Sequence, residues 1–230
     1  MPSRKFKLDY NEEYYRDMKA YPKKHMAKFI LHKLGALKSP ESVKWLDIGC
    51  GTGSMIKELL DLGIDAYGIE ISRAAIEMAP TKVKSRIVEA SILKIPFIDS
   101  EFHVVSAIDV VEHVHPRDIF QAISEICRIM RPSGYLILTT ANPCKASRWL
   151  YDLTHINVRP LRFWKDLLED SCFKVKSKYI PSDIVSYFKS LSSLSITPIL
   201  TIGEPIRYLL GWYYHHVKGR LYLLAEKIDE

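Results

Sequence analysis

Long apolar runs and paired cysteines are missing from this sequence. No stretch of about eighteen uninterrupted apolar residues occurs, so no membrane-spanning helix is expected. The four cysteines (Cys50, Cys127, Cys144 and Cys172) form no CxxC pair, which argues against a zinc ribbon or a disulfide scaffold and favours a reducing compartment. The first residues, Met1 to Lys5, have no apolar core behind them, so no signal peptide is expected. These absences together predict a cytoplasmic location.

Internal repeats and low-complexity tracts are absent as well, which excludes solenoid and disordered architectures. The 230 residues are 47% hydrophobic, enough for one α/β domain with a packed core and some decoration.

Positive charge gathers at one end of the chain. In residues 1–40, Lys and Arg exceed Asp and Glu by six, which equals the whole net charge of +6. In the remaining residues, positive and negative charges are equal in number. We interpret this segment as a basic helical arm with a solvated charged face. The alternative is a surface for an anionic partner such as RNA or a phospholipid membrane.

The central part of the chain alternates between short apolar runs and segments with helical periodicity. The predicted strands are Val43–Ile48, Ile64–Glu70, Ile87–Ala90, Phe102–Ile108, Tyr135–Thr140, Phe173–Ile180 and Arg220–Ile228. The predicted helices are 10–34, Ser54–Leu62, Ser72–Met78, one with Pro116 in its first turn, and Leu161–Asp170. This alternation predicts parallel βαβ units with right-handed crossovers.

A glycine-rich turn follows the first predicted strand. Gly49, Gly51 and Gly53 stand at alternate positions between that strand and a helix, where bare backbone can approach a ligand. Their spacing differs from the G-x-G-x-x-G of dinucleotide-binding domains. Asp47 before the turn suits a ligand with an ammonium group, and Glu70 at the end of the second strand suits the hydroxyls of a ribose.

These motifs resemble the class I S-adenosylmethionine-dependent methyltransferases of the small-molecule type, similar to the ubiquinone-pathway O-methyltransferases. The matching stretches are Leu46–Ser54, Tyr67–Ser72, Ile95–Phe97 with Phe102–Asp109, and Arg131–Thr140. The resemblance implies a Rossmann-like α/β fold: a seven-stranded, mostly parallel sheet with an antiparallel last strand and helices on both faces. It also implies S-adenosylmethionine as the cofactor, held by Asp47, Gly49, Cys50, Gly51, Gly53, Glu70, Ile71, Ser91, Ile92, Asp109 and Val110.

A second group of polar residues follows the fourth predicted strand. Asp109, Glu112 and His113 stand close together, and His155 comes from a later loop. The pattern is similar to the E-x-x-E-H arrangement that holds a divalent metal in small-RNA 2′-O-methyltransferases and ubiquinone-pathway O-methyltransferases, with Asp109 in place of the first Glu. We assign His113 and Asp109 as catalytic residues without a metal. The alternative is a divalent metal on Asp109, Glu112, His113 and His155 that lowers the pKa of a substrate hydroxyl.

Residues 181–218 are apolar and interrupted by prolines and a glycine. We expect a helical cap over the acceptor cleft; the alternative is a surface for a lipid-like acceptor or for peripheral membrane contact. The predicted organisation is a basic arm (1–40), a cofactor-binding core (41–180), the cap (181–218) and the final strand of the core (219–230).

The sequence therefore predicts an enzyme that transfers a methyl group from S-adenosylmethionine to a small-molecule acceptor, with oxygen as the acceptor atom and an apolar or lipid-like molecule among the candidates. One alternative is an RNA 2′-O-methyltransferase with a divalent metal. The other is a non-catalytic cofactor-binding or peripheral membrane protein.

Overall fold

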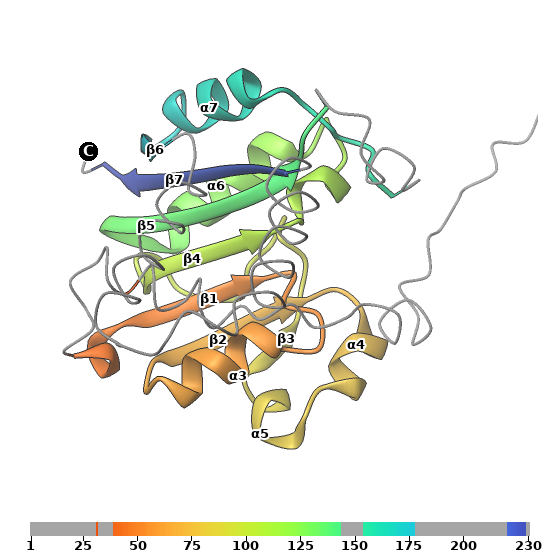
Figure 1. Ribbon diagram of the computed structural model, residues 1–230, viewed down its shortest axis with the longest axis vertical. Coiled ribbons are helices and arrows are strands. Elements are labelled where there is room, and N and C mark those ends of the chain that lie inside the picture. The colour runs from red at the N-terminus through yellow and green to blue at the C-terminus, as the bar shows by residue number, and fades with distance from the viewer. Residues whose placement is uncertain (1–30, 32–38, 144–153, 178–219, 229–230) are drawn as a thin grey trace, which may run out of the picture.

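The computed structural model describes residue 31 and residues 39–143, 154–177 and 220–228, and within them seven strands form one sheet (Figure 1). The strands are β1 (Lys44–Ile48), β2 (Asp65–Glu70), β3 (Ile87–Glu89), β4 (Phe102–Ile108), β5 (Met130–Ala141), β6 (Phe173–Ser177) and β7 (Arg220–Lys227). They lie in the order β3-β2-β1-β4-β5-β7-β6. Strand β7 runs antiparallel to both of its neighbours, and the pairs among the first five strands are parallel. The predicted sheet, with its antiparallel last strand, is confirmed.

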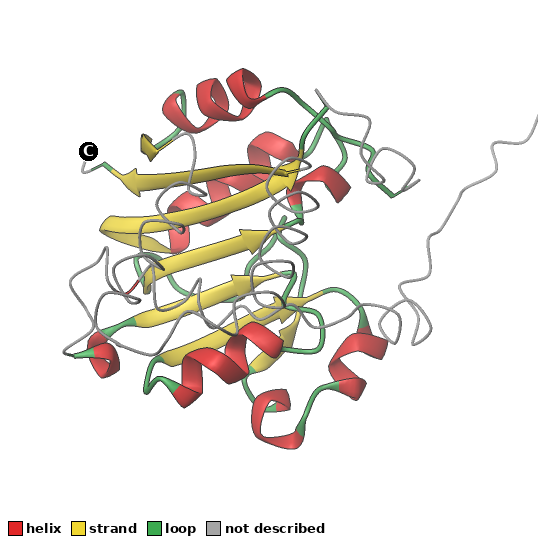
Figure 2. Cartoon of the chain, in the orientation of Figure 1, coloured by secondary structure: helices red, strands yellow, loops and turns green. Residues whose placement is uncertain are grey.

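Helices cover both faces of the sheet (Figure 2). They are α3 (Ser54–Asp61), α4 (Arg73–Met78), α5 (Thr81–Lys84), α6 (Ile119–Ile129) and α7 (Leu161–Glu169), with short 3-10 turns η2 (Pro40–Ser42) and η3 (Val111–His113). Successive side chains of a strand point to opposite faces. Accordingly, Leu46 and Ile48 pack in a core with α6 and α7, whereas Trp45 packs in a second core with α3.

Two local predictions around α6 are wrong. Pro116 lies in a turn before the helix, which begins at Ile119 after the N-cap residue Asp118. The strand predicted to begin at Tyr135 begins at Met130 instead, so Pro132, Ser133 and Gly134 belong to β5, whose pairing with β4 shifts register here. Ser133 has a φ of 58°, so the residues that suit a turn form an irregularity inside a continuous strand.

The basic arm and the apolar cap lie almost entirely outside the described residues, so the predicted domain boundaries stay a prediction. Among the described residues, no helix combines the length and the hydropathy needed to cross a bilayer.

A disulfide corrects the expectation of separate, reduced cysteines. Cys127 on α6 is bonded to Cys172, which follows α7, with 6.2 Å between the two Cα atoms and 45 residues between them in sequence. The pairing depends on how α6 and α7 pack on the same face of the sheet, which the spacing of the cysteines does not reveal. The bond removes the support that the cysteine pattern gave to a reducing compartment, and the cytoplasmic location stays a prediction.

Removing this bond is expected to destabilise the fold. A crosslink that closes a loop of 45 residues lowers the entropy of the unfolded chain. In the chain-entropy model this raises the free energy of unfolding by about 4 kcal/mol. We expect Cys172→Ser to lower the melting temperature by roughly 8–15 °C, measured by circular dichroism without reductant. Dithiothreitol should lower the melting temperature of the wild type and leave that of the variant unchanged. Equal melting temperatures and a full set of reactive thiols in the wild type would contradict the bond.

Candidate active site

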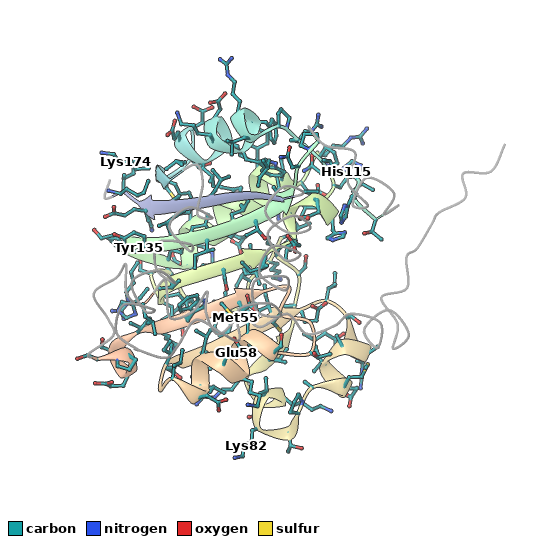
Figure 3. The ribbon with its side chains drawn as sticks, in the orientation of Figure 1. Met55, Glu58, Lys82, His115, Tyr135 and Lys174 are labelled. Atoms are coloured by element: carbon teal, nitrogen blue, oxygen red, sulfur yellow. A yellow bond between two sulfur atoms is a disulfide. The ribbon has the colours of Figure 1, made fainter. Side chains whose placement is uncertain are left out.

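The predicted site residues lie at one edge of the sheet. The carboxyl ends of parallel strands β1, β2, β4 and β5 meet there, and the strand order reverses between β1 and β4. In open α/β sheets this reversal opens the crevice in which ligands bind. Figure 3 shows His115 at this edge and Tyr135 at the opposite one.

The glycine turn between β1 and α3 depends on glycine for its conformation. Gly49, Gly51 and Gly53 have φ values of 62°, 56° and 77°, in the left-handed region that favours glycine. A Cβ atom on Gly49 would lie 2.6 Å from a methyl carbon of Val110, and one on Gly53 would lie 2.3 Å from a methyl carbon of Val83. The turn therefore packs tightly against the residues after β4 and on α5.

Glu70 at the end of β2 is tied to this turn. The backbone N–H of Gly51 donates to Oε2 of Glu70 over 2.9 Å, and the N–H of Ser72 donates to Oε1 over 2.8 Å. The residue is only 6% exposed, whereas its neighbour Ile71 is 63% exposed. The strand thus ends in a fixed carboxylate beside an apolar side chain that is open to solvent.

Asp47 lies deeper than the sequence suggests. It is 1% exposed, and its Oδ1 accepts a hydrogen bond of 2.7 Å from the Ser106 hydroxyl on β4. That hydroxyl also accepts a hydrogen bond from the Trp45 ring nitrogen. The predicted contact of Asp47 with an ammonium group stays a prediction, and no sequence signal indicates Ser106 as its partner.

The other predicted cofactor residues lie around the turn. Cys50 is buried, and its Sγ would lie 2.6 Å from a Cβ atom placed on Gly68 of β2. Ser91 forms a turn after β3, in which its hydroxyl accepts from the N–H of Leu93 over 3.2 Å. Ile92 packs against the core on the α6 face of the sheet.

Asp109 is bound to the neighbouring strand. Its φ of 55° is unusual for a residue other than glycine. Its N–H donates to the carbonyl oxygen of Thr139 on β5, and its Oδ1 accepts from the Thr139 hydroxyl over 2.8 Å. Such strain is often found at functional sites, and Thr139 is a partner that the sequence does not indicate.

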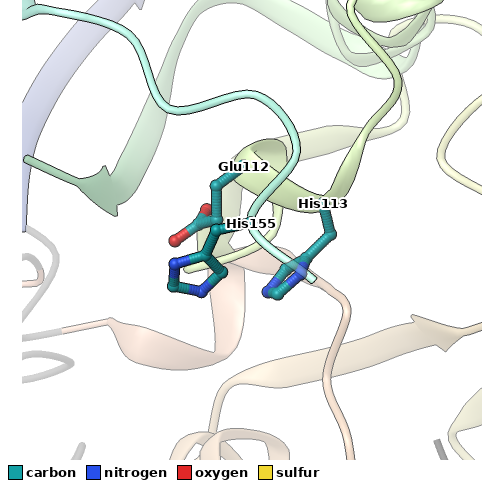
Figure 4. Close-up of side chains that lie close together, drawn as sticks. All are labelled: Glu112, His113 and His155. Carbon is teal, nitrogen blue, oxygen red and sulfur yellow. The ribbon is translucent and has the colours of Figure 1, made fainter. Parts of the chain in front are cut away.

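Three of the four predicted metal ligands converge. One ligand atom each from Glu112, His113 and His155 lies within 4.8 Å of the others (Figure 4). The two imidazole rings pack edge to face with 4.8 Å between their centroids. Asp109 is not part of this group.

Backbone contacts hold this group together. Glu112 is 1% exposed, and its Oε1 accepts from the N–H of Ala141. Its carbonyl oxygen accepts from the N–H of Asn157, which joins the loop of His155 to η3. Nδ1 of His113 lies 2.8 Å from the Thr154 hydroxyl and 3.2 Å from its carbonyl oxygen. The ring is therefore oriented through its Nδ1 atom.

The mostly parallel sheet carries a glycine turn after β1, a fixed acid after β2 and polar residues after β4. This arrangement is that of an α/β domain with a candidate cofactor site at the carboxyl ends of its strands. Comparison with known proteins agrees, since residues 46–138 match the family described as "Methyltransferase domain". The matched domain, together with the fold of the solved structures that resemble this chain, supports a class I S-adenosylmethionine-dependent methyltransferase.

Two curated relatives and one solved structure illustrate the similarity. The sterol 4-C-methyltransferase of Caenorhabditis elegans is 32% identical over 114 residues, covering 46% of this chain and 34% of the relative. The ubiquinone biosynthesis O-methyltransferase of Pelagibacter ubique is 30% identical over 112 residues, covering 46% and 45%. A methyltransferase structure from Archaeoglobus fulgidus matches with a TM-score of 0.58 and 20% identity, covering 94% of this chain and 97% of that one. The chain thus spans less than half the length of these two curated relatives.

Proposed function

We propose that this chain transfers the methyl group of S-adenosylmethionine to a hydroxyl oxygen of a small-molecule acceptor. The observation that carries the proposal is the fixed carboxylate of Glu70 against the glycine turn. The relative named for ubiquinone O-methylation supports oxygen as the acceptor atom, whereas the relative named for sterol methylation acts on carbon.

The residues present fit this cofactor. Each oxygen of Glu70 already accepts one backbone N–H and can accept a further hydrogen bond from a ribose hydroxyl. The exposed side chain of Ile71 can cover the adenine, and the glycine turn can contact the methionine part. When bound, the sulfonium supplies an electrophilic methyl group, so the protein needs chiefly to orient the acceptor and deprotonate it.

His113 is the proposed base. Thr154 binds its Nδ1 atom and so fixes the orientation of the ring beside Glu112 and His155. An imidazole held in this way is suited to take the proton of an acceptor hydroxyl near neutral pH. The buried carboxylate of Glu112 lies beside the two imidazoles and can stabilise the imidazolium that forms. Asp109, bound to Thr139, fixes the end of β4 next to this base.

A methyl-transfer assay tests the proposal. The purified chain is incubated with S-adenosylmethionine labelled in its methyl group and with a panel of phenols, apolar alcohols and sterols. Label on a hydroxyl oxygen supports the proposal, and label on carbon overturns the oxygen assignment. Failure to bind S-adenosylhomocysteine in calorimetry would overturn the cofactor assignment itself.

The second candidate is metal-dependent 2′-O-methylation of RNA, and the convergence of Glu112, His113 and His155 favours it. One carboxylate and two imidazoles are suitable ligands for a divalent metal. Such an enzyme would bind RNA with a strong dependence on salt.

We expect methyl transfer to continue without a metal. EDTA, followed by Mg²⁺, Mn²⁺ or Zn²⁺, should leave the rate of transfer within about twofold of the untreated enzyme, because the base mechanism needs only the side chain of His113. The measurement is the initial rate on the acceptor from the panel and on a small RNA. Loss of activity with EDTA and its recovery with one cation would establish the metal-dependent candidate in its place.

A further inference from the structure

The segment between β3 and β4 is held in place by one face of α6. Residues 90–101 contain no helix or strand, apart from an isolated bridge between Ser91 and Lys94. The segment nevertheless includes Ser91 and Ile92, which are predicted to border the adenine. Its position therefore depends on contacts from outside: Ile95 and Phe97 pack against the core, and α6 binds the backbone.

Three side chains of α6 bind the backbone of this segment. Gln121, Glu125 and Arg128 are spaced by four and three residues, which places them on one side of a helix. The amide of Gln121 donates to the carbonyl oxygen of Leu93 over 2.9 Å. Glu125 Oε2 accepts from the N–H of Ile95 over 2.8 Å.

Arg128 makes the largest share of these contacts. Its two terminal nitrogens donate to the carbonyl oxygens of Ile95 and Phe97, each over 2.9 Å. The same guanidinium forms a two-point hydrogen bond with Glu125 and an ion pair with Asp99. The planar group thus links the segment to α6 at several points, which the single ammonium of a lysine does not reproduce.

The charges within this group stabilise one another. The hydrogen bonds from Arg128 hold the pKa of Glu125 below its ordinary value, and the N–H of Ile95 acts in the same direction. Glu125 therefore stays ionised at neutral pH and keeps the guanidinium directed at the segment. In contrast, the side chain of Asp99 is 76% exposed, and its ion pair with Arg128 involves no backbone atom of residues 91–97.

We propose that Gln121, Glu125 and Arg128 are positioning residues that set the adenine-binding segment Ser91–Phe97 against the cofactor. The proposal rests on the proposed function, because it assigns the segment to the adenine of S-adenosylmethionine. The three residues act only through the backbone that they hold. Their loss therefore weakens recognition of the adenine and leaves the glycine turn and His113 unchanged.

Arg128→Lys tests the proposal. We expect its dissociation constant for S-adenosylhomocysteine to rise about tenfold in calorimetry. We expect the KM for S-adenosylmethionine to rise similarly, with kcat at saturating cofactor within twofold of the wild type. The wild type should prefer S-adenosylhomocysteine to S-inosylhomocysteine, which lacks the adenine amino group, and the variant should lose most of that preference. A merely stabilising contact would lower the melting temperature without changing this preference.

The matched control is Asp99→Asn, which removes the ion pair to Arg128 but none of the hydrogen bonds to the backbone of residues 91–97, and it should bind like the wild type. If Arg128→Lys does not fold, Gln121→Ala removes one exposed contact and should raise the dissociation constant about threefold. Unchanged affinity and preference in a folded variant would overturn the proposal. A wild type that binds neither nucleoside would overturn the proposed function, and this inference with it.

Discussion

Glu70→Ala is expected to weaken binding of S-adenosylhomocysteine by at least about 100-fold. A hydrogen bond to a charged group contributes about 1.5–3 kcal/mol, and the carboxylate is proposed to accept one from each ribose hydroxyl. The change also removes the acceptor of the Gly51 and Ser72 N–H groups, so the glycine turn loses its tie to β2. Glu70→Gln should have a smaller effect, because the amide keeps one acceptor oxygen. Some loss should remain, because its NH2 group then faces one of these two N–H groups.

The measurement is calorimetric titration with S-adenosylhomocysteine, with the melting temperature recorded for each variant. Glu89→Ala is the matched control, since Glu89 stands opposite Glu70 in the pairing of β2 with β3 but is exposed. The control should bind within twofold of the wild type. Equal losses of affinity in the two variants would contradict Glu70 as the residue that binds the ribose. No loss of affinity in either variant would contradict a cofactor site in this crevice.

The cofactor side of the site can be predicted from the sequence because its signals are local. A strand, three alternate glycines and a helix follow one another within residues 43–62, and the φ values of those glycines match that pattern. The acid at the end of β2 comes beside the turn because β1 and β2 pair in parallel. Local chain chemistry and one rule of sheet topology are enough to place both.

The partners of the polar residues could not be predicted in the same way. Asp47 binds Ser106, and Asp109 binds Thr139, each across neighbouring strands and far apart in sequence. These contacts depend on register, and a serine or threonine in an apolar strand carries no sign of what it binds. The Cys127–Cys172 bond has the same origin, because it follows from the packing of α6 beside α7.

For the same reason, only part of the pattern of Asp109, Glu112, His113 and His155 is found in the cluster that the structure shows. The backbone at η3 and the Asn157 contact bring the last three together. Asp109 stands at the end of β4, where its N–H and carboxylate both bind Thr139. Its place in the sequence fits a ligand set, while its hydrogen bonds fit a residue that fixes the strand end.

His113→Ala is expected to slow methyl transfer by about 10²- to 10⁴-fold, the usual contribution of a positioned general base. Its affinity for S-adenosylhomocysteine should stay within threefold of the wild type, because the imidazole is proposed to act on the acceptor. Thr154→Val should slow transfer less, since it removes the hydroxyl 2.8 Å from Nδ1 but keeps the carbonyl contact.

The control for this change is His115→Ala, which removes an exposed imidazole two residues away that contacts the N–H of Arg117. Single-turnover rates with the acceptor from the panel separate the methyl-transfer step from cofactor binding. A large loss of cofactor affinity in His113→Ala would show that the ring contacts the cofactor instead. A normal rate would mean that another group deprotonates the acceptor, and the carboxylate of this cluster is Glu112. Because the two readouts change independently, the pair of histidine variants separates a base from a packing residue even though the two histidines are only two positions apart in the sequence.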